Sequence, residues 1–534
     1  MASNSSQTIT PAPAGTVLDK SIVTSLILTI AATVVLVPKL IEVFRNALSP
    51  LSSIPGPLLN KLSSWPLTMA TLRGTRSVSQ SPSLLQLKLK LKISHHFARQ
   101  LHERYGPIVV MAPGIISVAD SDEIRRIIRT QDWPKSEAIY GNFRQDPSRP
   151  TLLAYTDKKA YSRRKRLMST MFGLRSIRAM EPLMRRCVAV AEQRLTRACE
   201  DDDSGAVVVD MLQLIHGLAI DIIGITTFGR SLGVVEKGSH PLPTRLKQGL
   251  KIAGWMQLMP CIRRLPLLPT RDPYIERFTR DTVEERRQLQ SHEPASDLLQ
   301  GLVEASDDSP GSEFRTSDVQ DESVVLLTAG SETTANAELF TLLLLTRHPA
   351  ALRRLYGEVD AWYPPEEPER QTDCSYSQAG MVYLQSCIDE AMRLVPGQAT
   401  GSPREAIRDE TVLGFRVPRG TTVFPNTQEA HLDARTWDRP DSFDPERWLS
   451  SNGADSSRPF WPFSAGSRVC IGKHFALQEM HLTLVSLLRR FHFEHVPGQD
   501  EETVFRVAQQ LAVDSYWMRV RLRKASDGLH GTVV

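Results

Sequence analysis

The stretch that most constrains this chain lies near its C-terminus, where Phe463–Gly472 reads FSAGSRVCIG ahead of a helical pattern over Lys473–Arg490. Gly466 allows a backbone conformation that is closed to residues with a Cβ, and Gly472 leaves room for a flat partner. Cys470 stands at the entrance of the predicted helix, where unpaired N–H groups and the helix dipole favour an anion. We therefore expect Cys470 to be biased towards the thiolate, which is the form that binds metals.

Arg468 lies two residues before this cysteine and is a fixed positive charge suited to a carboxylate. A lone cysteine in a tight turn is more often only a small core residue. The complete ten-residue pattern, however, resembles the haem-binding loop of the cytochrome P-450 family, Phe-x-x-Gly-x-Arg-x-Cys-x-Gly. In that family the cysteine thiolate is the proximal ligand of the haem iron. The resemblance implies that Cys470 ligates the iron of haem b, and that Phe463, Gly466 and Arg468 belong to the cofactor-binding loop.

The remaining cysteines and the charge balance exclude several other classes. The chain has six cysteines and no Cys-x-x-Cys pair, so neither a disulfide framework nor a closed zinc site is indicated. Cys470 and His474 have a spacing that suits a shared metal, but two further ligands are not evident. A reducing, cytosol-facing environment fits this usage. A net charge of +4 is only mildly basic and does not indicate nucleic-acid binding.

The first 60 residues predict a membrane attachment. Residues 1–20 are small and polar, and the apolar run over residues 21–40 is just long enough to span a bilayer, which takes roughly 20 residues. Residues 41–60 contain Ile-Pro-Gly-Pro, whose prolines stiffen the chain into a hinge. A cleaved secretory signal is the alternative, but the leading segment is not basic and no cleavage signature follows. We therefore predict a luminal tail, a retained transmembrane anchor and a proline-rich hinge ahead of a haem-binding monooxygenase domain over residues 61–534.

Basic residues around the apolar run predict its orientation. Lys20 precedes the run, whereas Lys39, Arg45 and Lys61 follow it. Because basic flanks stay on the cytosolic side, the body of the protein should face the cytosol. Asn4, in an Asn-x-Ser sequon, would then lie in the lumen as a potential glycosylation site. The sequence thus predicts a single-pass protein of the endoplasmic reticulum membrane.

The body reads as mostly helical with a few short strands. Strict alternation over Leu87–Ile93 suits either a half-buried strand or a lysine stripe on lipid headgroups, and the sequence does not separate the two. Short strands are predicted over residues 108–111 and 115–119, followed by a helix over residues 121–130. Residues 176–230 predict two helices. These patterns indicate a mainly α fold with small β-sheets, and the motif resemblance implies the P-450 fold.

A long apolar helix is predicted over Ser317–Arg347, with Ala-Gly-Ser-Glu-Thr-Thr at residues 329–334. Glycine inside a helix costs about 1 kcal/mol relative to alanine, so Gly330 requires a reason. Its missing side chain can let a planar group or dioxygen approach the backbone, although a core helix with a tolerated glycine is the alternative. The segment is similar to the Ala-Gly-x-Glu/Asp-Thr motif of the P-450 family. That resemblance implies that Thr333 positions the oxygen being activated and that Glu332 relays protons to it.

Two further segments resemble parts of the same family. Glu390 and Arg393 lie three residues apart on one helical face, which by default is a weak surface ion pair. They match the family motif Glu-x-x-Arg, and Phe-Asp-Pro-Glu-Arg-Trp around Arg447 matches the segment that supplies a third partner. The resemblance implies a structural triad behind the haem. Arg404, in Ser-Pro-Arg, resembles a strand arginine that reaches a haem propionate.

Tyr161 opens a basic run, Tyr-Ser-Arg-Arg-Lys-Arg, which is also consistent with a solvated surface. In the P-450 family the corresponding helix crosses the haem edge, and an aromatic residue and a basic residue four positions later bind propionates. By this spacing the two positions are Tyr161 and Lys165, although lysine lacks the bidentate fork of arginine. Arg164 or Arg166 is an alternative partner. The rest of the run suits an acidic electron-donor protein.

No dinucleotide fingerprint follows a predicted strand and no P-loop is complete, so the sequence predicts no flavin or nicotinamide domain. The resemblance therefore implies a haem-thiolate monooxygenase that takes electrons from a separate NADPH-dependent reductase. It would insert one atom of dioxygen into a lipophilic organic substrate, with secondary metabolism as the expected setting. Two other classes stay open, namely an oxygen-independent haem-thiolate isomerase or dehydratase and a non-enzymatic haem-binding sensor. The retained acid–alcohol pair disfavours both.

Overall fold

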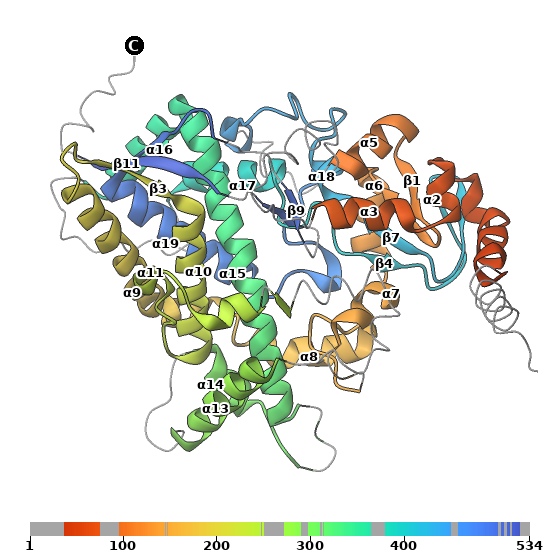
Figure 1. Ribbon diagram of the computed structural model, residues 1–534, viewed down its shortest axis with the longest axis horizontal. Coiled ribbons are helices and arrows are strands. Elements are labelled where there is room, and N and C mark those ends of the chain that lie inside the picture. The colour runs from red at the N-terminus through yellow and green to blue at the C-terminus, as the bar shows by residue number, and fades with distance from the viewer. Residues whose placement is uncertain are drawn as a thin grey trace, which may run out of the picture.

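The computed structural model describes residues 37–74, 96–249, 272–289, 297–364, 380–449, 458–499, 504–506, 510–512 and 515–523, apart from positions 145, 147, 247, 310, 311 and 313. Within these ranges the chain is mostly helical, with small sheets on opposite sides of a helical core (Figure 1).

Most of the described chain lies in α-helices. They are α2 (Leu58–Leu62), α3 (Trp65–Gly74), α5 (His96–Tyr105), α6 (Ser121–Arg125), α7 (Glu137–Tyr140), α8 (Lys158–Ser169), α9 (Leu174–Glu200), α10 (Met211–Phe228), α11 (Val234–Lys237), α13 (Pro273–Leu289), α14 (Leu298–Glu304), α15 (Thr316–Arg347), α16 (Pro349–Trp362), α17 (Val382–Leu394), α18 (Thr427–His431) and α19 (Lys473–Arg490). Tighter or wider turns are η1 (Pro50–Ser53), η2 (Arg126–Thr130), η3 (Gly141–Phe143), η6 (Pro445–Trp448) and η7 (Gly466–Arg468).

The strands are short. They are β1 (Ile108–Ala112), β2 (Ile115–Val118), β3 (Ala206–Asp210), β4 (Arg404–Glu405), β5 (Glu410–Val412), β6 (Phe415–Val417), β7 (Thr422–Pro425), β8 (Phe491–His495), β9 (Val504–Arg506), β10 (Gln510–Ala512) and β11 (Trp517–Leu522).

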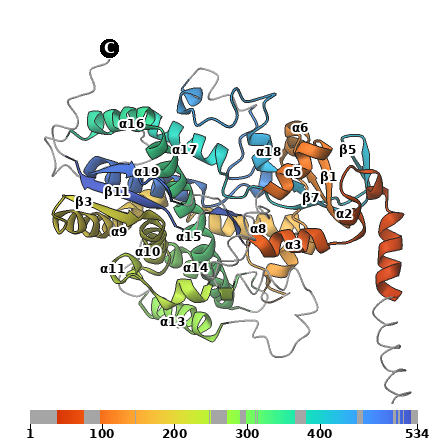
Figure 2. The same ribbon diagram turned by 45° about the horizontal axis from the view of Figure 1, so that its top comes forward.

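Helix α15 runs through the middle of the molecule and packs against α10, α17 and α19, as two views show (Figures 1 and 2). At its start the Asp318 carboxylate accepts a hydrogen bond from the Arg315 N–H at 2.9 Å. The helix ends at Arg347 because Pro349 opens α16, and the residue before a proline avoids the helical conformation. Its central position makes α15 the element around which the core is built.

Helix α10 is the one helix of the described residues that is long and apolar enough to cross a membrane. Of its 18 residues, 89% are buried inside the protein, which is typical of a core helix. The carboxylate of Asp210 caps its start by accepting from the Leu212 N–H at 3.1 Å, and Gly229 ends it with φ +72°. Helix α10 therefore packs as part of the apolar core beside α15.

Two small sheets flank this core. The first has the order β1-β2-β7-β4, in which β2 and β7 are parallel and the other neighbours are antiparallel. The second has the order β3-β11-β8 and is antiparallel throughout. Strands β5 and β6 form one antiparallel pair, and β9 and β10 form another. In the first sheet Arg404 of β4 pairs with Val423 of β7, so this sheet places a predicted site residue.

The predicted elements agree with the structure where the signal is local. Helix α19 has the predicted bounds, and α15 begins one residue before the predicted Ser317. The helix predicted over residues 121–130 is present as α6, which continues into the π-helical turn η2. The prediction of only two helices over residues 176–230 is incomplete, because β3 lies between α9 and α10. Its partner β11 is at the far end of the chain, so no local pattern marks it.

Several predictions fall on residues outside the described ranges. These are the anchor over residues 21–40 up to residue 36, the sequon at Asn4, and the alternating stretch Leu87–Ile93. Residues 37–47 are described and helical. Apolar side chains on this helix and shortly after it are strongly exposed, namely Leu40, Ile41, Phe44, Leu48, Leu58, Leu59 and Trp65.

Candidate functional site

The loop over Phe463–Gly472 forms a closed turn directly ahead of α19. The Cys470 N–H donates to the carbonyl of Phe463 at 2.9 Å, which closes the loop on itself. Gly466 has φ +70°, and a Cβ at this position would clash with the carbonyl oxygen of Ile128 in η2. Both observations require glycine here, in agreement with the predicted backbone role of Gly466.

The Cys470 side chain is exposed, and Gly472 borders it: an added Cβ there would lie 3.9 Å from Sγ. The side chain is accessible, yet the surrounding protein still desolvates the thiol, and this burial is the largest influence on its pKa, which it raises. The Gly472 N–H and the charges of Lys165, Lys135 and Lys473 lower it. The predicted bias of the free thiol towards thiolate is therefore wrong in its net direction, since desolvation outweighs these groups. A bound metal ion would remove the proton.

Helix α8 places two predicted site residues beside this loop. Tyr161 and Lys165 lie one turn apart on one face of α8. Lys165 Nζ donates to the carbonyl oxygens of Ser467 and Val469 at 2.9 and 3.0 Å. Lys165 thus anchors the backbone on both sides of Arg468 and brings a positive charge close to the thiol.

The two alternatives to Lys165 point elsewhere. Arg164 is buried and lies 3.4 Å from Asp318 and 3.8 Å from Glu322, both on α15. It therefore joins α8 to the start of the central helix. Arg166 is exposed. The structure brings Lys165, and neither arginine, to the cysteine loop.

Arg468 lies over the ring of Tyr161, with its guanidinium carbon 3.8 Å from the ring centroid. Its two Nη atoms donate to the carbonyl oxygens of Tyr155 and Thr156 at 2.8 and 2.9 Å. Among the described residues its Nε has no hydrogen-bond partner. This buried guanidinium is thus held from one side and keeps one donor for an anion.

Arg404 is fully buried, with 0% of its surface exposed. Its Nη1 donates to the carbonyl of Trp133 at 2.7 Å, and the nearest oxygen of Asp132 lies 3.7 Å away. In the part of the chain that the structure describes, Nε and Nη2 have no hydrogen-bond partner. A buried guanidinium with two unused donors is costly unless a ligand satisfies them.

Lys135 is a buried cation that the sequence did not reveal. Its ammonium lies 4.5 Å from the ring centroid of Tyr140 and 5.8 Å from that of Tyr161. Burial, followed by the charges of Arg468 and Arg404, lowers its pKa to about 7. Desolvation and the neighbouring positive charges therefore both disfavour the protonated form of this side chain.

Four cations thus gather beside the cysteine loop, namely Lys135, Lys165, Arg404 and Arg468. The carboxylate of Asp132 lies near them, but it also accepts from Ser467 at 2.6 Å and pairs with Lys158 at 3.1 Å. Within the described ranges, three guanidinium nitrogens of the cluster are left unpaired. This cation cluster therefore suits a ligand that carries carboxylates.

The middle of α15 presents an accessible stripe of side chains. Ala329 is exposed, and Val325 and Thr333, one turn before and after it, are half-buried. Thr333 Oγ1 donates to the carbonyl oxygen of Ala329 at 2.7 Å. Glu332 is half-buried beside Thr333. The predicted acid–alcohol pair thus occupies the part of α15 that the rest of the core leaves uncovered.

Gly330 has a different role from the predicted one. A Cβ at this position would lie 2.9 Å from Cδ1 of Ile223, on α10. The missing side chain lets α10 and α15 pack closely, because any added carbon would have to displace a buried neighbour. The prediction that Gly330 opens the backbone to a planar group or dioxygen is therefore wrong. Ala329 and Thr333 form the accessible stripe.

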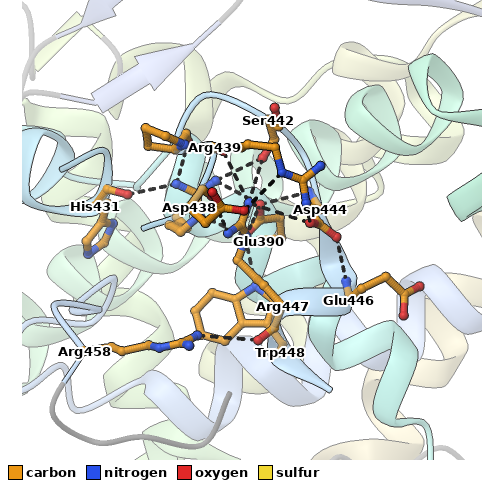
Figure 3. Close-up of polar contacts among 12 residues, drawn as sticks. Glu390, His431, Asp438, Arg439, Ser442, Asp444, Glu446, Arg447, Trp448 and Arg458 are labelled. Atoms are coloured by element: carbon orange, nitrogen blue, oxygen red, sulfur yellow. Dashed lines mark hydrogen bonds and ion pairs between the residues drawn. The ribbon is translucent and has the colours of Figure 1, made fainter. Parts of the chain in front are cut away.

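Glu390 and Arg393, both fully buried, form a bidentate ion pair on α17 with both distances at 2.8 Å. Arg447 adds its Nε to the same carboxylate at 3.0 Å, so the structure brings the three predicted residues together. Figure 3 shows Glu390 and Arg447 within this cluster of polar contacts. The indole of Trp448 and the N–H of Asp444 also donate to Glu390. Arg393 in turn donates to three backbone carbonyls, those of His431, Pro440 and Ser442.

A family model described as Cytochrome P450 matches residues 80–515 of the chain.

The chain belongs to the cytochrome P450 family.

Its curated relatives include fungal members of this family that match along almost their whole length. The cytochrome P450 monooxygenase LUC2 of a Fusarium species is 65% identical over 506 residues, which cover 95% of this chain and 96% of that protein. FUS8 of Gibberella moniliformis is 60% identical over 491 residues, 92% of each chain. The monooxygenase acrD of Aspergillus aculeatus is 57% identical over 505 residues, 94% of this chain and 97% of that one.

The fold agrees with the same family. The crystal structure of the cytochrome P450DA heme domain superposes with a TM-score of 0.67 at 21% identity, covering 86% of this chain and 95% of that chain. The family model and the relatives at 57–65% identity show that the chain is a haem-thiolate monooxygenase, with haem b as its cofactor.

The residues of this cytochrome P450 fit the haem. The thiol of Cys470 is exposed beside a glycine, which leaves a flat group free to approach the sulfur. The unpaired nitrogens of Arg404 and Arg468 are suited to the two propionate carboxylates, which are planar acceptors. Tyr161 and Lys165 support this cluster, Tyr161 beneath Arg468 and Lys165 through the cysteine loop. Propionate binding by Tyr161 and Lys165 themselves stays a prediction.

Replacing Arg404 by glutamine should speed haem loss from the P450 by about tenfold to a hundredfold, because a hydrogen bond to a charged group contributes about 1.5–3 kcal/mol. The transfer of haem to an excess of a haem-free globin measures this rate. Arg408→Gln is the control, since that side chain is 71% exposed. The haem-free Arg404→Gln protein should unfold at the same or a higher denaturant concentration, because the variant removes one of four crowded cations. A large loss of stability of the haem-free protein would indicate a structural role instead.

Some residues of the site were not predicted from the sequence. Lys135 lies in Trp-Pro-Lys-Ser, a loop sequence that carries no periodicity to predict its burial. Asp132, which joins Arg404 to the cysteine loop through Ser467, is an ordinary loop aspartate by sequence. Trp448 follows Arg447 directly in the matched Phe-Asp-Pro-Glu-Arg-Trp segment, so its contact with Glu390 could have been anticipated.

Proposed function

We propose that this P450 is a membrane-attached monooxygenase that inserts one oxygen atom into a lipophilic substrate of secondary metabolism. The observation that carries the proposal is that one chain combines an exposed thiol in a glycine-bordered turn with an accessible stripe of α15 that contains Thr333, next to Glu332. Val325 and Ala329 continue this stripe ahead of Thr333 and are apolar, which supports a lipophilic substrate. The relatives at 57–65% identity are named monooxygenases and come from fungi.

The chemistry divides between cofactor and protein. When bound through Cys470, haem supplies the iron at which dioxygen is activated. The Thr333 hydroxyl donates to the carbonyl oxygen of Ala329. This bond fixes Oγ1 of Thr333 on the accessible face of α15, where it can accept or donate a proton. Glu332, the neighbouring acid, would replace the proton that Thr333 gives up. The oxygen-independent isomerase and the haem sensor need no such pair, and its presence supports the monooxygenase.

We infer that electrons come from a separate NADPH-dependent reductase. Exposed basic side chains on α8 surround the segment that anchors the cysteine loop, namely Lys158, Lys159, Arg163 and Arg166. A cationic surface next to the thiolate loop suits an acidic donor protein, because complementary charge speeds association. This surface supports the donor assignment that the sequence suggested.

We infer that the body rests against the membrane to which the chain is anchored. Leu40, Phe44 and Leu48 lie on one face of the helix over residues 37–47 and its end, and each is at least 67% exposed. Exposed apolar groups of this size mark contact with a membrane or a partner. Leu40 is the last residue of the predicted anchor over residues 21–40, and Phe44 and Leu48 follow it. This place supports a bilayer, with the body in the cytosol at the endoplasmic reticulum.

Replacing Thr333 by alanine should reduce the product formed per NADPH by about tenfold or more and send the electrons into hydrogen peroxide. NADPH consumption, peroxide and product are measured together with the reductase present. Thr341→Ala is the matched control, because this buried threonine makes the same 2.7 Å bond to the carbonyl four residues earlier. An unchanged yield per electron would remove Thr333 from proton delivery. Turnover without NADPH or reductase would replace the proposal with the isomerase.

A further inference from the structure

His431 is the last residue of α18 and is fully buried. Its imidazole ring contacts residues directly ahead of the Phe463–Gly472 loop. The backbone N–H of Trp461 donates to its Nε2 at 2.9 Å. Trp461 lies two residues before Phe463, where the cysteine loop begins. The ring of Phe460 packs on the imidazole with 5.4 Å between the centroids. The imidazole is therefore built into the approach to this loop.

The hydrogen bond from the Trp461 N–H determines which nitrogen of the His431 imidazole carries the proton. A backbone N–H can only donate, so Nε2 carries the lone pair and the proton of the neutral imidazole is on Nδ1. Nδ1 lies beside backbone groups of Met392 and Arg393 at the end of α17, although outside hydrogen-bond geometry among the described residues. Burial and the charge of Arg393 lower the pKa of His431 to about 3. The imidazole is therefore a neutral acceptor under working conditions.

The backbone carbonyl of His431 points in the opposite direction from its side chain. Its carbonyl accepts from Arg393 Nη1 at 2.8 Å, which places His431 at the edge of the Glu390 cluster, with its ring pointing away from it (Figure 3). One residue thus binds Arg393 with its backbone and the approach to the cysteine loop with its side chain.

Two further hydrogen bonds carry this link to the cysteine. The carbonyl of Trp461 accepts from the Ser464 N–H at 2.9 Å, and the carbonyl of Phe463 accepts from the Cys470 N–H at 2.9 Å. Ser464 adopts φ +60°, a conformation that a residue with a side chain keeps only when its surroundings hold it. A shift of Trp461 would therefore displace Cys470, because the two turns closed by these hydrogen bonds connect them.

We propose that His431 is a positioning residue for the iron ligand, because its imidazole acceptor fixes Trp461 and ties the cysteine loop to the Glu390–Arg393 pair. The proposal rests on the proposed function in one respect, namely that Cys470 binds the haem iron as a thiolate. It adds a residue outside the matched motifs and assigns it one specific atom, Nε2.

The test compares three variants of the full-length protein. His431→Phe keeps an aromatic ring against Phe460 but removes the acceptor, whereas His431→Gln offers a side-chain oxygen to the Trp461 N–H. His481→Phe is the control, because His481 is also buried but pairs with Gln385. For each protein the haem content is measured, together with the rate at which the red-shifted carbon-monoxide band of the reduced protein converts to the unshifted band.

We expect His431→Phe to convert about tenfold faster than the wild type, because a buried N–H is left without an acceptor. His431→Gln should recover most of the wild-type rate, and His481→Phe should not raise it to the level of His431→Phe. If His431→Phe takes up no haem, uptake by His431→Gln alone supports the role. Equal rates for both His431 variants, or an equal effect of His481→Phe, would overturn it. A wild-type protein without the red-shifted band would instead refute the thiolate ligand itself.

Discussion

Cys470→Ala is expected to abolish the red-shifted carbon-monoxide band of the reduced protein and all NADPH-dependent product formation. Its sulfur is the group in this turn that can bind iron as an anion, and no other side chain of the Phe463–Gly472 loop can replace it. Difference spectra of reduced protein with and without carbon monoxide report the ligand directly. The haem content is measured in parallel, because Arg404 and Arg468, the proposed propionate partners, would still bind haem without the sulfur.

Cys187→Ala is the control for removing a thiol as such. Cys187 is buried on α9, and burial raises its pKa to about 12, so its thiol stays protonated and apart from iron chemistry. This variant should keep the band at its wild-type intensity. Retention of the band in Cys470→Ala would contradict the assignment of the iron ligand.

Arg393→Lys is expected to lower the free energy of unfolding by about 3–5 kcal/mol, which is the cost of breaking a buried ion pair. Arg393 uses its planar fork on Glu390 and also binds three backbone carbonyls, and lysine cannot reproduce this geometry. Denaturant titration of the wild-type and variant proteins, both with haem bound, measures the change. A loss of this size is a large part of the stability of a typical domain.

Arg439→Lys provides the comparison within the same cluster. Arg439 pairs with Asp444 at 2.8 Å, but its side chain is 65% exposed, so little change in the free energy of unfolding is expected. Equal effects of the two substitutions would show that burial does not set the importance of this cluster. The structural role assigned to Glu390, Arg393 and Arg447 would then have to be abandoned.

The sequence predicted those parts of the molecule whose evidence is local. The bounds of α19, nearly those of α15, and the glycine requirement at Gly466 follow from periodicity and backbone freedom over a few residues. Glu390 and Arg393 could be paired because they share a helical face. Arg447 could be added only through a motif, because nothing in its own segment points to a partner more than 50 residues earlier in the chain.

What the sequence missed depends on distant packing. Strand β3 exists because β11 pairs with it, and Lys135 is buried by elements that the chain brings together from afar. Distant packing also explains why two predictions were wrong, namely the open backbone at Gly330 and the thiolate bias of Cys470. Gly330 meets Ile223 of another helix, and the thiol of Cys470 is desolvated by neighbours that a helix-terminus argument does not contain. Burial is a property of the folded chain as a whole, so short-range patterns do not report it.

The four cations beside the cysteine loop, three of them buried and Lys165 half-buried, have a consequence for how this enzyme matures. Without a carboxylate ligand they repel one another in a medium that screens charge poorly, and the folded form pays for that repulsion. Haem whose propionates bind these cations, as proposed above, would relieve it and would favour the folded form by mass action. A cell that makes this chain faster than it makes porphyrin would therefore accumulate polypeptide vulnerable to proteolysis, and the supply of the pigment would set how much enzyme survives.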